Sequence, residues 1–236
     1  MQPIFFVNLI MALINLPVAF GSLPDSLRCA NLTTRSIEPN RVFANGVKVT
    51  GESIYPLQTV LNNLNLTSSE IEQLKPKEVL LVAEGFSGLL PYFLKHGCLG
   101  VQAVDLWYHQ TDIPHEGDGL RMREYIATHG RYLIQGDVFN LPFANDSKDA
   151  VLSHLLVHHF PEAYYEEMTL EMLRVLRPGG VARIYGYIGI PHHLIKKLLA
   201  MGHTVAHRTS IVTLHPDGKP LPWPLSLLKI GKHQTK

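Results

Sequence analysis

The sequence contains little cysteine and no long run of charge of one sign. Its two cysteines, Cys29 and Cys98, are too few for a disulfide framework and lack the spacing of metal ligands. They could form one bridge in an oxidising compartment or remain two thiols. Lys and Arg total 21 against 20 Asp and Glu, a formal net charge of +1. Because no basic stretch could follow a phosphate backbone, the sequence gives no indication of a nucleic-acid partner.

Charge is also missing from the first 20 residues, which are rich in Phe, Ile, Leu, Val and Ala. Ala19-Phe20-Gly21 before Ser22 has the small-x-small pattern of a signal-peptidase site, although a basic n-region is lacking. The span is near the minimum length of a transmembrane helix, and its asparagines and prolines weaken that interpretation. Residues 1–21 therefore predict an exported protein or one with membrane contact through residues 1–20. A cytoplasmic location follows if the segment is an anchor or a misassigned start.

The remaining chain divides into an arm, one domain and a tail. Residues 22–51 mix Pro, Asn, Thr and Gly without periodicity, as in a linker or a loosely attached arm. The length and the 46% hydrophobic content fit one α/β domain with extensions, which we place at residues 52–218. Residues 219–236 form a C-terminal tail that is first proline-rich and then basic.

Strand-like apolar runs alternate with helical stretches through this domain. The spacing predicts strands at 79–83, 101–105, 132–136, 150–154, 181–187, 204–207 and 210–214, and helices at 89–96, 119–128, 164–176 and 192–201. One or two further helices precede the first strand, with Thr67-Ser68-Ser69-Glu70 as a helix start. The alternation predicts a parallel sheet.

A buried apolar strand that runs directly into small residues, Val79–Gly88, is the most informative stretch. About 20 positions after its glycines comes Asp105, where a carboxylate at the end of a second strand meets ribose hydroxyls. Gly136-Asp137 ends a third strand. These residues predict binding of an adenosine cofactor. The alternatives are a turn that binds nothing, a solvated carboxylate at Asp105 and a helix N-cap at Asp137.

Three segments resemble the class I S-adenosylmethionine-dependent methyltransferases, in particular the type 11 family that includes ubiquinone and menaquinone biosynthesis enzymes. They are Val79–Gly88 with Asp105, Gly136–Phe143 through Asp149–Val151, and Glu171–Gly180. The strings GD-x-x-x-LPF followed by D-x-V, and RVLRPGG, are the specific part. The resemblance covers about residues 75–187 and implies a Rossmann-like α/β sandwich. Such a fold has a mostly parallel seven-stranded sheet with helices on both faces.

The resemblance also implies an enzyme that uses S-adenosylmethionine and holds it at the ends of the first four strands. The implied cofactor-binding residues are Ala83, Glu84, Gly85, Ser87, Asp105, Leu106, Asp137, Val138 and His154. Asp105 would accept the ribose hydroxyls, Asp137 the adenine amino group, and the backbone at His154 would meet the amino-acid end. Trp107 and Tyr108 could pack against the cofactor or close the pocket.

The turn departs from the family pattern at three positions. The three glycines of the family fall on Ala83, Gly85 and Ser87, and the family's acidic residue falls on Leu81. Glu84 could partly replace that carboxylate, and the Ser87 hydroxyl could bond the cofactor. These departures and the export-like N-terminus leave a second hypothesis open, a catalytically silent fold that acts as a binding or secreted interaction protein. A nicotinamide dehydrogenase is a weaker alternative.

No catalytic residue and no metal site can be named from the sequence. The histidines in Val157-His158-His159-Phe160 lack a Glu or Cys to complete a ligand set, although a general base among them stays open. Many methyl transfers need mainly alignment of the nucleophile with the methyl group, so no base is required. The expected acceptor is a small or lipid-like molecule. Its pocket could be lined by Tyr55, Tyr185, Tyr187, His192 and His193.

Overall fold

The computed structural model describes residues 55–233, except 86, 107, 109–115 and 210–223, and the side chains of 116–122. The proposed signal or anchor segment (1–21) and the arm (22–51) therefore lie outside the described residues. Among the helices that are described, none has the length and apolar character needed to cross a membrane.

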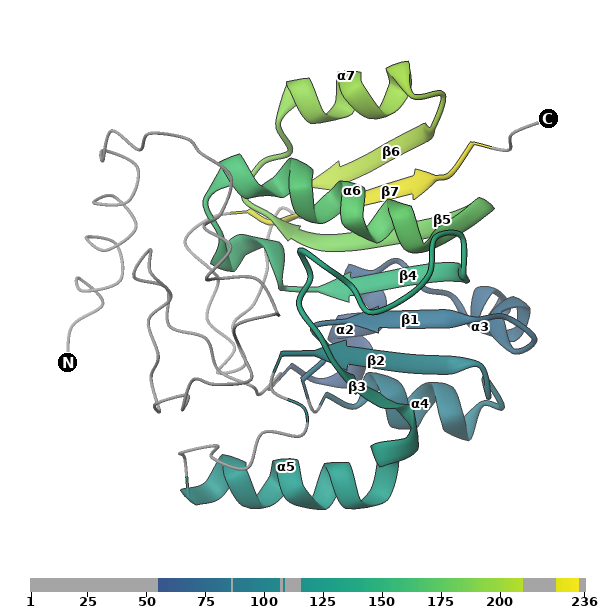
Figure 1. The fold of residues 1–236 in the computed structure, drawn as a ribbon, viewed down its shortest axis with the longest axis vertical. Coiled ribbons are helices and arrows are strands. Elements are labelled where there is room, and N and C mark those ends of the chain that lie inside the picture. The colour runs from purple at the N-terminus through teal and green to yellow at the C-terminus, as the bar shows by residue number, and fades with distance from the viewer. Residues whose placement is uncertain (1–54, 86, 107, 109–115, 210–223, 234–236) are drawn as a thin grey trace.

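A seven-stranded sheet in the order β3-β2-β1-β4-β5-β7-β6 forms the middle layer (Figure 1). Its strands are β1 Val79–Val82, β2 Val101–Asp105, β3 Leu133–Gln135, β4 Lys148–His154, β5 Leu176–Tyr187, β6 Thr204–Thr209 and β7 Ser226–Gly231. Strands β1 to β5 pair in parallel, and β7 pairs antiparallel with both β5 and β6. The mostly parallel α/β sandwich expected from the sequence is confirmed.

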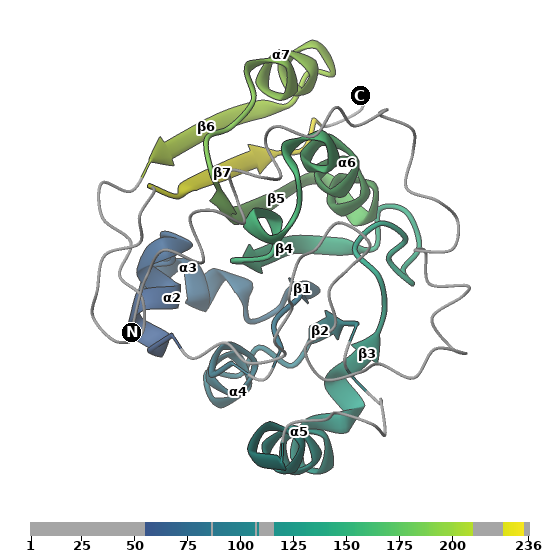
Figure 2. The ribbon, with the colours of Figure 1, turned by 90° about the vertical axis from the view of Figure 1, so that its left-hand side faces the viewer.

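Helices cover both faces of the sheet (Figure 2). They are α2 Leu57–Asn63, α3 Ser68–Leu74, α4 Leu89–Lys95, α5 Glu116–His129, α6 Tyr165–Val175 and α7 His192–Ala200, with short 3₁₀ turns η3 Gly130–Tyr132, η4 Val157–His159 and η5 Glu162–Tyr164. Side chains alternate along each strand. Val79 and Leu81 therefore pack with α2, α3 and α4, whereas Leu80 and Val82 pack with α6 and α7. Burial on both faces explains the uninterrupted apolar run of β1.

A buried cation, Arg183, attaches the first two described helices to the sheet. Arg183 in β5 is 5% exposed, and its guanidinium donates to the backbone carbonyls of Leu64, at 3.0 Å, and Asn65. It also pairs with the Glu70 carboxylate. Glu70 in turn closes a capping box with Thr67 at the start of α3, as the sequence predicts. This contact joins the residues that follow α2, and the first turn of α3, to β5.

The C-terminal boundary of the domain differs from the sequence expectation. Strand β7 lies within residues 219–236, which the sequence analysis assigned to a tail. Leu227, Leu228 and Ile230 are buried in the sheet, so the domain includes this segment. Strand β7 is short and follows a proline-rich stretch, so the sequence pattern did not indicate a strand there. The strand expected at 210–214 lies outside the described residues.

Strand β5 begins earlier than predicted. Helix α6 ends at Val175, one residue before the predicted end, but Arg177-Pro178-Gly179-Gly180 continue as strand rather than as a turn. The Gly179 N–H donates to the Lys232 carbonyl and the Lys232 N–H donates to the Gly180 carbonyl, at 3.0 and 2.9 Å. Pairing with the chain after β7 therefore overrides the local turn signal of proline and glycine.

Candidate cofactor site

The turn after β1 has a backbone conformation that few side chains adopt. Ala83 and Gly85 both have positive φ, 54° and 61°. The Ala83 N–H donates to the Val104 carbonyl at 2.8 Å, which fixes the start of the turn against β2. A left-handed backbone explains why the related family uses glycine at the position of Ala83. The turn keeps this shape although alanine occupies the position.

Asp105, at the end of β2, is the residue to which the turn is attached. Its side chain is 7% exposed, and its Oδ2 accepts a hydrogen bond of 3.0 Å from the Gly85 N–H. The Gly136 N–H at the end of β3 donates to the Asp105 carbonyl at 3.1 Å. The carboxylate therefore lies at the carboxyl edge of the sheet, between the glycine turn and the third strand, and is not the solvated loop group of the alternative interpretation.

Glu84 and Ser87 satisfy the first backbone donors of α4. The Ser87 hydroxyl donates to Glu84 Oε1 at 2.5 Å and accepts from the Leu89 N–H at 3.1 Å. Glu84 Oε1 also accepts from the Leu90 N–H at 3.2 Å. Serine at the third glycine position is thus used within the protein, where it caps the helix and orients the carboxyl group of Glu84.

Two tyrosine hydroxyls reach the other carboxyl oxygen of Glu84. Tyr108 and Tyr125 lie 3.0 and 2.9 Å from Oε2. Tyr108 also donates to the Gly85 carbonyl. Tyr108 was expected to face or close the pocket, whereas Tyr125 on α5 carried no signal in the sequence beyond its place on a predicted helix. Both hydroxyls stabilise the turn after β1: Tyr108 lies in the segment after β2, and Tyr125 lies on α5.

Asp137 organises the loop after β3 rather than capping a helix. Its Oδ1 accepts from the Phe139 N–H at 3.0 Å, and its carbonyl accepts from the Asn140 N–H at 3.0 Å. Val138 is buried between them. A side chain on Gly136 would meet Val104 and Pro142 at 2.7 Å, so glycine is required where this loop leaves the sheet.

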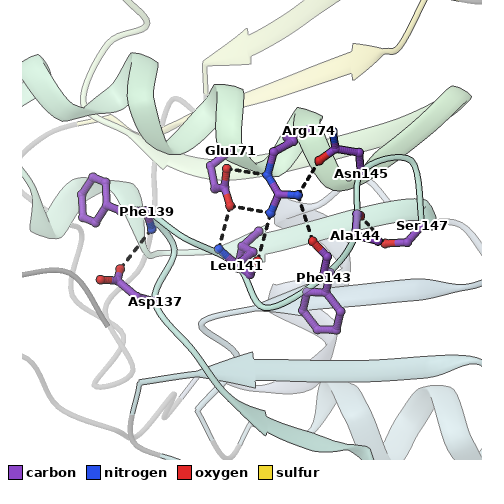
Figure 3. Close-up of polar contacts among 9 residues, drawn as sticks. All are labelled: Asp137, Phe139, Leu141, Phe143, Ala144, Asn145, Ser147, Glu171 and Arg174. Atoms are coloured by element: carbon purple, nitrogen blue, oxygen red, sulfur yellow. Dashed lines mark hydrogen bonds and ion pairs between the residues drawn. The ribbon is translucent and has the colours of Figure 1, made fainter. Parts of the chain in front are cut away.

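An arginine clamp from α6 fixes the same loop (Figure 3). The Arg174 guanidinium donates to both oxygens of Glu171, at 2.9 and 2.8 Å, and to the carbonyls of Leu141 and Phe143, at 2.9 Å each. It also reaches Asn145 Oδ1 at 2.7 Å. Glu171 returns to the loop by accepting from the Leu141 N–H at 2.7 Å. The two strings GD-x-x-x-LPF and RVLRPGG are therefore parts of one contact.

His154 ends β4 among aromatic rings. Its imidazole stacks on Tyr185, with centroids 5.3 Å apart at 13°, and meets Tyr55 edge-on at 5.6 Å. Its Nε2 lies 3.0 Å from Asn63 Nδ2 on α2. Its buried Nδ1 has no hydrogen-bond partner among the described residues. Asn63 was not predicted, because nothing in a helical asparagine indicates contact with a strand 91 positions away.

A small pocket joins these elements at the edge where the chain order of the sheet reverses, between β1 and β4. It is lined by Val60, Leu81, Val82, Ala83, Glu84, Ser87, Leu89, Leu152 and His154. In parallel sheets, ligands bind at such a switch point. The structure therefore brings together the predicted residues Ala83, Glu84, Ser87 and His154, with Gly85 and Asp105 joined to them by their hydrogen bond. Asp137 and Val138 lie in the next loop along the same edge.

Other predicted residues have different surroundings. Leu106 packs against the core on the α2 side, and its carbonyl accepts from Gln135 at 3.4 Å. Tyr187 was expected near the acceptor but is fully buried against α6, where its hydroxyl lies 2.6 Å from Thr169 Oγ1. His192 and His193 are exposed at the start of α7, and His193 lies 4.0 Å from Glu166. Trp107 lies outside the described residues.

Comparison with known proteins gives a family similarity for this part of the chain. Residues 81–184 match the type 11 family model described as a methyltransferase domain. This stretch, a little under half of the chain, is similar to a methyltransferase domain. A structure from Galdieria sulphuraria assigned as a sarcosine dimethylglycine methyltransferase shares the fold, with a TM-score of 0.50 at 14% identity over 75% of this chain and 86% of that chain.

Two curated proteins are similar in sequence over part of the chain. A protein of Encephalitozoon cuniculi named as a methyltransferase is 42% identical over 60 residues. The phthiotriol/phenolphthiotriol dimycocerosates methyltransferase 1 of Mycobacterium ulcerans is 30% identical over 125 residues. The matches cover 25% and 53% of this chain and 29% and 42% of the relatives, so the chain spans less than half the length of either relative.

A substitution at Ala83 tests the strain in the turn after β1 directly. Ala83→Gly is expected to raise the free energy of unfolding by about 1 kcal/mol, because glycine adopts the left-handed conformation without the cost that a Cβ imposes. Urea denaturation would measure the change. Ala103→Gly, in the middle of β2, is the matched control and should lower stability. An equal loss in both variants would show that Ala83 is not strained.

The clamp predicts a local effect of Arg174→Lys. Lysine lacks the planar guanidinium that reaches Glu171, two carbonyls and Asn145 together. We therefore expect the free energy of unfolding to fall by about 1–2 kcal/mol and the loop to open more often. Amide hydrogen exchange should become faster in residues 137–147. Arg131→Lys, whose guanidinium lies 4.5 Å from the centre of the Tyr132 ring, is the control and should leave that exchange unchanged. Unchanged amide exchange in Arg174→Lys would contradict the proposal that Arg174 fixes this loop.

Two partly buried histidines, His154 and His159, are expected to make the stability of the protein sensitive to acid. Burial lowers the pKa of His154 to about 3 and that of His159 to about 4. Their folded pKa values lie below the ordinary value of about 6.5. The stability that the neutral histidines contribute is therefore complete above that pH and is lost as the pH falls toward 4. As the pH falls, the free energy of unfolding of His159→Gln should therefore decrease by up to about 1.4 kcal/mol less per pH unit than that of wild type. Urea denaturation at several pH values would measure the difference. His193→Gln, at an exposed position, should behave as wild type.

Proposed function

We propose that the chain is an S-adenosylmethionine-dependent methyltransferase that acts on a small-molecule or lipid-like acceptor. The observation that carries the proposal is the buried Asp105 carboxylate, bonded to the Gly85 N–H beside the pocket at the switch point. A carboxylate there can accept the ribose hydroxyls of a nucleoside. The family match of residues 81–184 and the shared fold support the same assignment.

The residues along the carboxyl edge fit the parts of this cofactor. Asp137 and Val138 lie where an adenine ring would need polar partners, and Ala83 and Gly85 allow close approach of the backbone. His154, whose Nδ1 is buried beside the pocket, offers a polar group to the amino-acid end. The cofactor supplies an electrophilic methyl group on its sulfonium sulfur. The contribution of the protein is to bind, orient and desolvate, since in-line alignment provides most of the rate.

The acceptor class rests on two features. The matched relative from Mycobacterium ulcerans is named for dimycocerosate substrates, which supports a lipid-like acceptor. Tyr55 and Tyr185 place aromatic surface beside His154 at the pocket. Aromatic and apolar side chains with few polar groups are typical of sites for largely apolar small molecules.

Transfer of a labelled methyl group tests the proposal. The full chain is incubated with methyl-labelled S-adenosylmethionine and with separate lipid and water-soluble extracts of the native host. Label is expected in one class of small molecule, and Asp105→Asn should strongly reduce the transfer while the exposed Glu72→Gln retains it. Binding of cofactor without labelling of any fraction would instead favour the catalytically silent fold, for which the replacement of the acidic residue by buried Leu81 is the motivating observation.

A further inference from the structure

The hydrogen bonds around the Glu84 carboxyl group require one proton more than the neighbouring hydroxyl groups supply. The Tyr108 hydroxyl has a single proton but contacts both the Gly85 carbonyl and Glu84 Oε2. A carbonyl oxygen only accepts. If Tyr108 donates to Gly85, its 3.0 Å contact with Oε2 requires a proton on the carboxyl group. A protonated Glu84 satisfies both contacts, whereas an ionised one leaves two oxygens facing each other without a proton.

The surroundings of Glu84 favour the same state. Glu84 is 6% exposed, and its contacts among the described residues are the hydroxyls of Ser87, Tyr108 and Tyr125 and one backbone N–H. Burial raises its pKa to about 8. Among the described residues, the ionisable groups that face it add no positive charge. Burial, together with the carboxyl groups of Glu84 and Asp105, raises the pKa of both tyrosines, and burial keeps His154, which also lines the pocket, neutral at pH 7.

We propose that Glu84 carries a proton in the ligand-free protein and releases it to solvent when S-adenosylmethionine binds. The inference rests on the proposed function. Glu84 lines the same pocket as His154, where the proposed function puts the amino-acid end of the cofactor. That end carries a sulfonium and an ammonium group against one carboxylate, a net charge of +1. An opposite charge favours the ionised carboxyl group, so the neutral acid becomes a carboxylate as one proton passes to the buffer.

The demethylated product differs from the cofactor by this charge. S-adenosylhomocysteine has a neutral sulfur and no net charge, so it offers the Glu84 carboxylate less stabilisation. Proton release upon its binding should be smaller. Glu84 would therefore make the pocket prefer the charged cofactor to the product, and this preference should grow as the pH rises toward 8.

Calorimetry on the full chain counts the protons. Titrations with S-adenosylmethionine at pH 7, in buffers with different ionisation enthalpies, should give close to one proton released. Affinity should rise up to about tenfold per pH unit until about pH 8 and then level off. Glu84→Gln mimics the neutral acid and should remove the release, apart from any ionisation of the ligand itself. Glu72→Gln, at an exposed position, should retain it.

Two results would overturn the inference. The first is binding of S-adenosylmethionine with equal proton release in wild type and Glu84→Gln. The second needs no ligand: because Glu84 has a folded pKa above its ordinary value, wild type should lose stability relative to Glu84→Gln as the pH rises from about 4.5 to about 8. Parallel curves would show an ionised Glu84. Absence of any cofactor binding would refute the proposed function instead, and the stability curves would still decide the protonation of Glu84.

Discussion

Asp105→Asn is expected to weaken the binding of S-adenosylmethionine and S-adenosylhomocysteine by about 100-fold. The carboxylate would accept both ribose hydroxyls, and hydrogen bonds to a charged group contribute about 1.5–3 kcal/mol each. A combined loss of about 3 kcal/mol corresponds to a factor of about 100 in Kd. Asparagine retains the shape and one acceptor oxygen, so the Gly85 N–H can keep its partner. Equilibrium dialysis with labelled cofactor would measure the change.

The control for this substitution is Asp146→Asn. Asp146 is about half exposed, pairs with Lys232 and lies in a turn next to β4, at the other end of that strand from His154. Its replacement should leave the affinity unchanged. Thermal unfolding of both variants would verify that each is folded. A Kd in Asp105→Asn within threefold of wild type would remove Asp105 from the cofactor site.

Arg183→Met is expected to lower the free energy of unfolding by about 3 kcal/mol. The guanidinium is buried and satisfies two carbonyls at the end of α2 together with Glu70. Removing one partner of a buried pair leaves the others desolvated and unpaired, which costs about 3–5 kcal/mol. Because Glu70 keeps partial access to water, we expect the lower end of this range. Chemical denaturation would measure the loss.

Lys229→Met provides a matched control on the neighbouring strand. Lys229 is 3.9 Å from the same Glu70 carboxylate, but its side chain is 41% exposed. Exposed pairs contribute about 1 kcal/mol or less, so its replacement should have a small effect. Equal losses in the two variants would mean that Glu70, rather than the buried guanidinium, determines the attachment of α2.

The attachment of α2 by Arg183 also affects the candidate cofactor site, because Asn63 of α2 contacts His154 and Val60 of α2 lines the pocket. Release of the helix end at Leu64 and Asn65 should therefore loosen one wall of the pocket. The effect of Arg183→Met on cofactor affinity is expected to be smaller than that of Asp105→Asn, since Arg183 acts only by positioning α2.

The sheet and the turn could be predicted because their signals are local. Val79–Val82 is apolar on both faces and leads into small residues, and Asp105 follows at the spacing of a second parallel strand. The capping box at Thr67 and Glu70 is likewise a contact within one turn of helix. Such contacts depend on neighbours in sequence, which a pattern can reveal.

Contacts between distant segments were not accessible in this way. Tyr125 reaches Glu84 from 41 positions away, and Arg174 reaches Phe143 from 31. The sequence suggested that Glu84 could replace the missing acid at Leu81, but its hydroxyl partners come from α5 and the end of β2. Strand β7 was missed for a related reason, since its pairing with β5 is decided by tertiary contacts rather than by its own short pattern.

A crystal structure of the full chain with S-adenosylhomocysteine would test the central claim most directly. The account predicts both ribose hydroxyls within hydrogen-bond distance of the Asp105 carboxylate, at about 2.6–2.9 Å, with adenine beside Asp137 and the amino-acid end beside Glu84 and His154. Nucleoside bound elsewhere, or Asp105 still bonded to Gly85 and without contact to the ribose, would contradict it.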